Sequence, residues 1–162
     1  MIKIISIILA MFSSHVFSMG DEFFSEFERE LNNPQKRERA ISAVRALPPS
    51  VKENVLKGLK LNFDELSRRL PQQLDSETML LSVLVSQYGV TYDHQLSLKI
   101  INQMSDQEAT FKESIYDYSK NRVCSEPRQF FFLLLGINYI FQYHGADGKM
   151  YYSYRITENS CV

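Results

Sequence analysis

The sequence predicts a mainly α protein. We expect a compact array of about seven to eight short helices, with a C-terminal β-hairpin or extended segment tied back by one disulfide. Three observations predict this. Helix-start residues recur as far as residue 121. The segments between them are two to five residues long. The final quarter then changes to Tyr, Phe and Ile around a glycine-containing turn.

The first 18 residues have the pattern of a secretory signal peptide. Lys3 supplies a positive start, Ile4 to Phe12 is apolar and uncharged, and Val16 and Ser18 occupy the small-residue positions before a cleavage site. The apolar block is shorter than the ~20 residues that a membrane span needs. We therefore expect a signal peptide over 1–18, or a cut after Gly20. The mature domain, 19–162, would be periplasmic or secreted and would have no stable membrane span.

The charge of the chain is nearly balanced. It has 162 residues with 18 basic and 19 acidic side chains, and removal of Lys3 with the signal peptide leaves a net charge of −2. Nucleic-acid binding needs a clustered basic face, and no long run of one sign is present, so no nucleic-acid partner is expected. No phosphate-binding glycine loop and no metal-spaced Cys/His set occurs, so no cofactor and no metal is predicted.

Two helices are expected at the start of the mature chain. Asp21 is a candidate N-cap for a helix over 21–31. Asn33 caps the next, over 34–47, and Pro34 takes its first position, where a missing N–H costs nothing. Each has an apolar stripe at helical spacing: Phe23, Phe24, Phe27 and Leu31 in the first, and Ala40, Ile41, Val44 and Leu47 in the second.

Two more helices are expected before Pro71. Ser50 and Glu53 form a capping box for a helix over 50–59. Asn62 caps a short helix over 62–70. Their apolar positions again fall on one side: Val51, Val55, Leu56 and Leu59, then Phe63, Leu66 and Leu70.

Three further helices are predicted over 75–89, 91–104 and 105–121. The last begins with a second capping box, Ser105 with Glu108. The first is apolar nearly all round, which is typical of a buried helix, so we expect it at the centre of the fold. Its apolar residues are Met79, Leu80, Leu81, Val83, Leu84 and Val85.

The most apolar stretch of the second half follows Ser125. It is too short and too interrupted by polar residues to span a bilayer, so we expect a core helix over about 126–138. Turn-forming residues over 145–148 and a Tyr-rich segment over 150–156 also fit a hairpin. Whether 139–156 is a hairpin, or helix followed by an extended segment, stays open at this point.

The two cysteines, Cys124 and Cys161, are expected to form one disulfide. An exported protein meets an oxidising compartment, where such a bridge persists. Closing a loop of about 38 residues contributes ~4 kcal/mol in the chain-entropy model. The bridge would hold the C-terminal tail, which otherwise tends to fray.

Five of the nine tyrosines lie in the C-terminal quarter, which suggests a recognition surface. Tyrosine offers a large contact area with a polar tip and is enriched at protein interfaces. The candidate partner-binding residues are Tyr151, Tyr152, Tyr154, Arg155 and His144.

These features favour a non-catalytic, exported binding module with a protein partner outside the cytoplasm. Inhibitors and immunity proteins of the periplasm have this general build, with a short signal peptide, one bridge and no active site. An inhibitor or immunity-type protein is therefore the main hypothesis. An accessory subunit of an envelope or secretion complex is an alternative, and a homo-oligomer is compatible with either.

The first alternative to the inhibitor hypothesis, ahead of the accessory subunit, comes from Glu113 and Ser114, within "FKESIYDYS". A Glu–Ser pair on a helix of an exported chain resembles the catalytic corner of lytic transglycosylases, which cleave cell-wall glycan. The resemblance implies a cell-wall hydrolase with Glu113 as general acid/base. It covers two residues, and the Gly-Leu-Met-Gln-type segment that this family has downstream is missing here.

Overall fold

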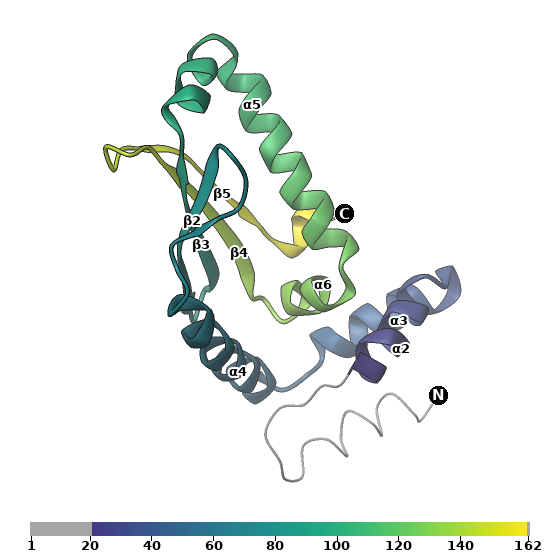
Figure 1. The fold of residues 1–162 in the computed structure, drawn as a ribbon. Coiled ribbons are helices and arrows are strands. Elements are labelled where there is room, and N and C mark those ends of the chain that lie inside the picture. Colours follow the sequence, from purple (N-terminus) through teal and green to yellow (C-terminus); the bar gives the residue numbers. More distant parts are fainter. Residues whose placement is uncertain (1–20, 162) are drawn as a thin grey trace.

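The computed structural model describes residues 21–161, without the side chains of Asp21 and 104–106. The predicted signal peptide over 1–18 and the predicted caps at Asp21 and Ser105 lie outside what is described. Within the described part, six helices pack on a five-stranded mixed sheet (Figure 1). The protein is therefore a mixed α/β fold, and the prediction of a mainly α array of seven to eight helices is wrong.

The sheet follows the order of the chain, β1-β2-β3-β4-β5. Its strands are β1 (Gln72–Gln73), β2 (Thr78–Ser86), β3 (Gly89–Leu96), β4 (Asn138–His144) and β5 (Met150–Ile156). Every neighbouring pair is antiparallel except β3 and β4, which run parallel. A parallel pair needs a long crossover, and two helices between these strands supply it.

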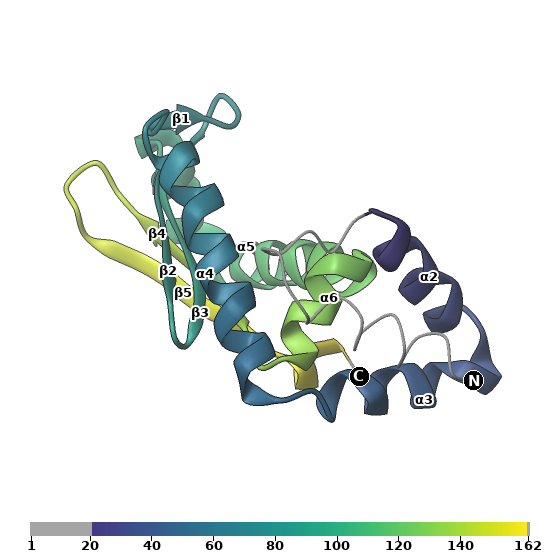
Figure 2. The same ribbon diagram turned by 90° about the horizontal axis from the view of Figure 1, so that it is seen from below.

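The helices are α2 (Asp21–Leu31), α3 (Pro34–Arg45), α4 (Pro49–Ser67), α5 (Leu98–Ser125), α6 (Pro127–Leu134) and the 3-10 helix η1 (Glu158–Cys161). Figure 2 shows α4 alongside β2 and β3, with α2 and α3 beyond α6. α2 spans the predicted range, and α3 begins at Pro34 as predicted but ends at Arg45, two residues before the predicted end. Asn33 caps α3 by accepting a 3.0 Å hydrogen bond from the Gln35 N–H.

The sheet has one covered face and one open face, because side chains alternate along each strand. On the covered face, strand register brings together Val90, Tyr92, His94 and Leu96 of β3, Tyr139, Phe141 and Tyr143 of β4, and Tyr152, Tyr154 and Ile156 of β5. The open face carries Thr91, Asp93 and Gln95, then Ile140, Gln142 and His144, and finally Ser153 and Arg155. Packing contacts place both α4 and α5 on the covered face.

The central helix predicted over 75–89 is instead a hairpin of β2 and β3. A register shift between Leu80 and Ser82 breaks the alternation of β2, so the run looks apolar on all sides. Gly89 closes the turn with φ of +141°, a conformation that side chains rarely adopt. The predicted helix over 91–104 is likewise wrong in its first half, which belongs to β3.

Two other helix boundaries differ from the prediction. The segments over 50–59 and 62–70 form one helix, α4, which begins at Pro49 without a side-chain cap, so the predicted Ser50 box is not its start. The segments over 98–121 likewise merge into α5, whose one non-helical residue is Gln107. α6 ends at Leu134, and the hairpin alternative for the tail is confirmed by the pairing of β4 with β5.

A phenylalanine cluster attaches the N-terminal helices to the rest. Phe23, Phe24 and Phe27 of α2 each make ring contacts with Phe131 of α6, at centroid distances of 5.4, 5.8 and 5.6 Å. Phe131 is completely buried, so burial of this cluster stabilises the docking of α2.

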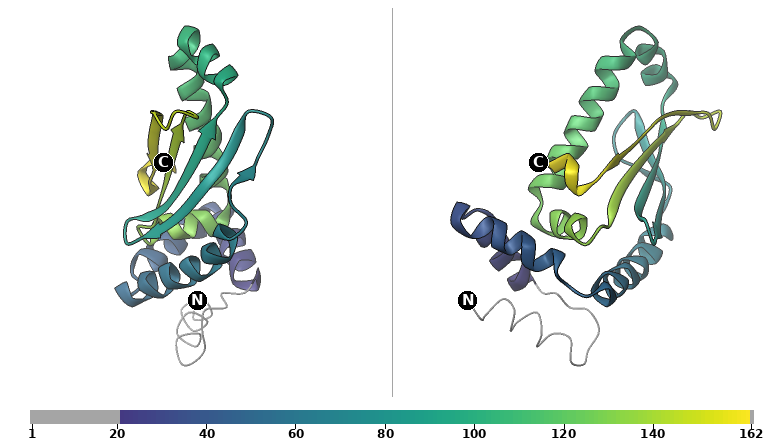
Figure 3. Two further views of the ribbon diagram at one scale, coloured as in Figure 1. Left: turned by 60° about the vertical axis from the view of Figure 1, so that its left-hand side comes forward. Right: turned by 180° about the vertical axis from the view of Figure 1, so that it is seen from behind.

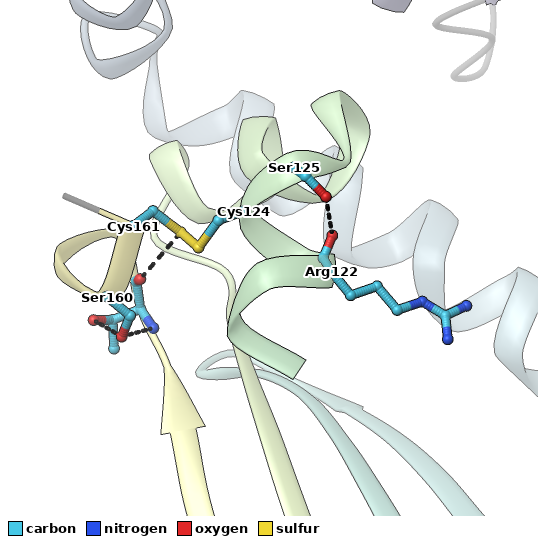
Figure 4. The surroundings of a disulfide bond; sticks show 6 residues. Arg122, Cys124, Ser125, Ser160 and Cys161 are labelled. Carbon is cyan, nitrogen blue, oxygen red and sulfur yellow. Dashed lines mark hydrogen bonds between the residues drawn. A yellow bond between two sulfur atoms is a disulfide. The ribbon is translucent and has the colours of Figure 1, made fainter. Parts of the chain in front are cut away.

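The predicted disulfide joins Cys124, in the last turn of α5, to Cys161 in η1, with a Cα–Cα distance of 5.4 Å (Figure 4). η1 is also held by an ion pair between Arg45 of α3 and Glu158, with Arg45 Nε 2.8 Å from the carboxylate. The chain after β5 is therefore fixed to the C-terminal end of α5. None of the helices within 21–161 is long and apolar enough to cross a membrane.

Candidate functional site

A cavity of about 830 Å³ lies between α5 and the covered face of the sheet. α5 runs along this face in both views of Figure 3. The floor is made by β3 and β4, one wall by α5, and the other by the loop that leads from β1 into β2. We call this cavity the α5 groove. Its lining includes Tyr92, His94, Phe141, Phe111, Ile115 and Tyr118.

The floor of the α5 groove is a layer of stacked aromatic rings. Tyr92 stacks on Phe141 at 5.4 Å between centroids, and His94 stacks on Tyr143 at 4.8 Å. The rings come from neighbouring strands at matching register, Tyr92 opposite Phe141 and His94 opposite Tyr143. The result is a broad, preformed apolar surface of the kind that binding sites use.

The walls leave large apolar side chains open to solvent. Tyr118 on α5 is 67% exposed and Leu74 on the facing loop is 50% exposed. Ile115 and Phe111 continue the α5 wall one and two turns before Tyr118, respectively. An apolar groove rimmed by such side chains marks an interaction site in soluble proteins.

Hydrogen bonds fix the position of α5 over the sheet. The Tyr154 hydroxyl of β5 lies 2.7 Å from Ser119 Oγ of α5 and 3.3 Å from the Tyr143 hydroxyl. Ser119 is buried, and burial raises the pKa of Tyr154 and of Tyr143, so both phenols stay protonated at neutral pH. This network sets the spacing between the wall and the floor of the groove.

His94 is a buried titratable group within the floor. It is 7% exposed, and burial lowers the pKa of its imidazole, against smaller opposing effects from the Gln142 backbone and the Asp93 carboxylate. The ring is therefore neutral at pH 7 and packs as an aromatic side chain.

The five tyrosine-tail residues predicted to bind a partner do not share one surface. Tyr152 and Tyr154 are on the covered face, where Tyr154 bonds to α5 and Lys112 lies over the Tyr152 ring at 5.3 Å. Arg155 and His144 are on the open face. Tyr151 lies in the register shift between β4 and β5 and packs with Leu96 and Tyr143. Their role in binding remains a prediction, and the geometry divides it between two sites.

His144 on the open face has a carboxylate partner. Its Nε2 lies 3.0 Å from Asp93 Oδ1, and its Nδ1 lies 3.4 Å from the Gly148 carbonyl oxygen. Among the residues that the structure describes, no group of three or more His, Cys, Asp or Glu side chains is placed to hold a metal ion.

Glu113, the acid of the hydrolase hypothesis, is exposed on α5 and does not line the groove. Its neighbour Ser114 does line it and donates a 2.8 Å hydrogen bond to the Thr110 carbonyl oxygen within α5. The position of Glu113 therefore gives no support to a catalytic role.

The groove residues Tyr92, His94 and Phe141 were not among the candidates from the sequence. One pattern could have revealed them, since Val90, Tyr92, His94 and Leu96 alternate with Thr91, Asp93 and Gln95. No comparable sequence pattern predicts that α5 lies over this face of the sheet.

Comparison with known proteins gives matches to solved structures only. No family model and no curated protein matches the sequence. A Pseudomonas aeruginosa protein described as secreted is similar over 68% of this chain and 96% of its own, with a TM-score of 0.56 and 15% identity. EpsS, the pilotin of the Vibrio vulnificus type 2 secretion system, is similar over 70% of this chain and 97% of its own, with a TM-score of 0.53 and 17% identity. At these identities the matches establish that the chain shares the fold of these two proteins.

Proposed function

We propose that this protein is an exported, non-catalytic binding module that serves as an accessory subunit of an envelope secretion complex. It would hold an apolar segment of a partner protein in the α5 groove. The observation that supports this most directly is the groove itself, with its aromatic floor and its exposed apolar walls.

The fold shared with a secretion-system pilotin supports the choice of an envelope complex over other settings. Export is supported by the signal-peptide pattern over 1–18 and by the disulfide. We propose a single domain over 19–162 that acts outside the cytoplasm. The inhibitor or immunity hypothesis has no counterpart among these similar structures, and the five candidate residues on which it depended do not share one face of the sheet.

A pair of tyrosines provides a matched test of where the partner binds. Tyr118 is 67% exposed and lines the groove, whereas Tyr88 is 65% exposed at the β2–β3 turn and does not line it. Each is replaced separately by the photo-crosslinking residue p-benzoylphenylalanine in the producing cell. Illumination should give one discrete protein adduct from position 118 and none from position 88.

The adduct should disappear when Ile115→Glu is added, because a charge would then lie in the apolar wall. Circular dichroism of that variant verifies that the fold survives. An absence of adducts from position 118, or equal adducts from both positions, would refute a partner site in the groove. Turnover of cell-wall glycan by the purified protein that is lost in Glu113→Gln would favour the hydrolase instead.

A further inference from the structure

The α5 groove is apolar in its middle and polar at both ends, with Asp75 and Glu77 at one end and a donor-rich set at the end next to α6. There the lining comprises Arg122 of α5, Gln129 of α6, Tyr92 of β3 and Tyr139 of β4. A guanidinium, an amide and two phenols together offer several hydrogen-bond donors and one positive charge. An end of this composition favours an anionic group over a cationic one.

The two phenols lie side by side and lack partners. Tyr92 and Tyr139 stack with centroids 6.5 Å apart and an angle of 15° between their planes. Neither hydroxyl has a hydrogen-bond partner among residues 21–161, as far as their side chains are described. Burial raises the pKa of Tyr92 to about 12 and also raises that of Tyr139, so both remain O–H donors at neutral pH.

Arg122 brings the positive charge to the same place. Its side chain extends away from the bridge between Cys124 and Cys161 (Figure 4). No carboxylate of a described side chain lies within ion-pair distance of its guanidinium. Arg122 and Tyr92 both line the groove, and the guanidinium charge lowers the pKa of Tyr92 against the larger effect of burial.

One acid lies near this end of the groove. Glu126, one turn after Arg122, caps α6 by accepting a 3.3 Å hydrogen bond from the Arg128 N–H, and its charge contributes to the raised pKa of Tyr139. At the other end of the groove, Glu77 accepts from Lys99 Nζ at 2.7 Å, and Asp75 accepts from the Glu77 N–H at 2.8 Å. The donors at the α6 end are thus left for a ligand.

We infer that the α6 end of the groove is a carboxylate-binding subsite, in which Arg122, with the hydroxyls of Tyr92 and Tyr139, binds an Asp or Glu side chain of the partner segment. The apolar floor would take the neighbouring apolar side chains of the same segment. Because hydrogen bonds between an ionised donor and a carboxylate are stronger than neutral ones, this contact would select segments and fix their direction along the groove. The inference rests on the proposed function and names the chemistry of the partner at that site.

The test begins with peptides selected by the purified, oxidised protein from a displayed library of random 16-residue sequences. The selected peptides should combine apolar residues at regular spacing with an acidic residue at one fixed end. Selection on Arg122→Gln should recover apolar peptides without that acidic position. Arg37→Gln, an exposed residue of α3, is the matched control and should select the same peptides as the unaltered protein.

One selected peptide is then made with amidated ends, and its acidic residue is changed to Gln or Asn. The change should weaken binding to the unaltered protein by about tenfold, the scale of one charge-assisted contact, and should not weaken binding to Arg122→Gln. Tyr92→Phe should partly reduce the difference in affinity between the acidic peptide and its Gln or Asn version.

Three outcomes would overturn the inference. Arg122 does not bind the acid if the selected peptides show no preferred acidic position. The same follows if changing the acid to its amide weakens binding equally to the unaltered protein and to Arg122→Gln. Binding that needs a free C-terminal carboxylate instead of a side chain would show a different source for the anion. Failure to select any peptide that binds the unaltered protein but not Ile115→Glu would reject the proposed function itself. In the other two outcomes peptides still bind in the groove, so failure of the subsite and failure of the proposed function can be told apart.

Discussion

Removal of the disulfide should cost about 4 kcal/mol of the free energy of unfolding. The change is Cys124→Ala with Cys161→Ala, which leaves no free thiol. The cysteines are 37 residues apart, and the loop-entropy model gives ~4 kcal/mol for a loop of that length. A domain of this size has a net stability of only ~5–15 kcal/mol, so the loss is a large fraction of the total.

Urea unfolding followed by far-ultraviolet circular dichroism measures this directly. With a slope of ~2 kcal/mol per M, the midpoint should fall by ~2 M in the double variant. The unaltered protein in reducing agent should unfold at the same urea concentration as the double variant. If oxidised protein and double variant unfold at the same midpoint, the bridge does not restrict the unfolded chain, and the account of how the tail is held is wrong.

Three further changes test the sheet and the groove. Gly89→Ala should cost at least ~3 kcal/mol, because its Cβ would lie 2.0 Å from the Asn138 carbonyl oxygen at φ of +141°, whereas Gly148→Ala, with open space around it, should cost ~1 kcal/mol in the same urea assay. Tyr154→Phe should cost ~1–2 kcal/mol by leaving the buried Ser119 hydroxyl without its 2.7 Å partner, and Ser119→Ala added to it should recover part of that loss. The pKa of His94 is lowered in the folded state, so below pH ~6.5 the unfolded chain binds a proton that the folded protein does not. The free energy of unfolding should therefore fall as the pH drops from ~6.5 to the folded-state pKa of His94. His94→Phe should flatten this part of the stability-versus-pH curve, and an unchanged curve would contradict a lowered pKa for His94.

The parts of the fold that could be predicted are those with strong local patterns. Asn33 followed by Pro34 locates the start of α3, because the cap and the ring act within one turn. The glycines around residue 145 indicate a turn, and the Tyr-rich flanks indicate the strands beside it. The cysteine pair could be assigned because only one pairing exists.

The hairpin of β2 and β3 could not be predicted as easily, because its periodicity is interrupted. The shift between Leu80 and Ser82 moves apolar residues out of alternation, and Leu84 is 63% exposed although it looks like a core residue. Pairing of β3 with the distant strand β4 then stabilises the hairpin, and local propensity cannot predict such long-range pairing. The same holds for the groove, since Tyr92 of β3 and Ile115 of α5 meet only through the tertiary fold.

The location of Cys161 imposes an order of events on the chain. It follows every strand, while Cys124 precedes β4 and β5. A polypeptide that emerges from a translocation channel N-terminus first therefore presents all five strands before the second thiol arrives. The bridge can therefore form only after all five strands have left the channel, so an oxidoreductase that forms it acts on a chain whose whole sheet is already outside.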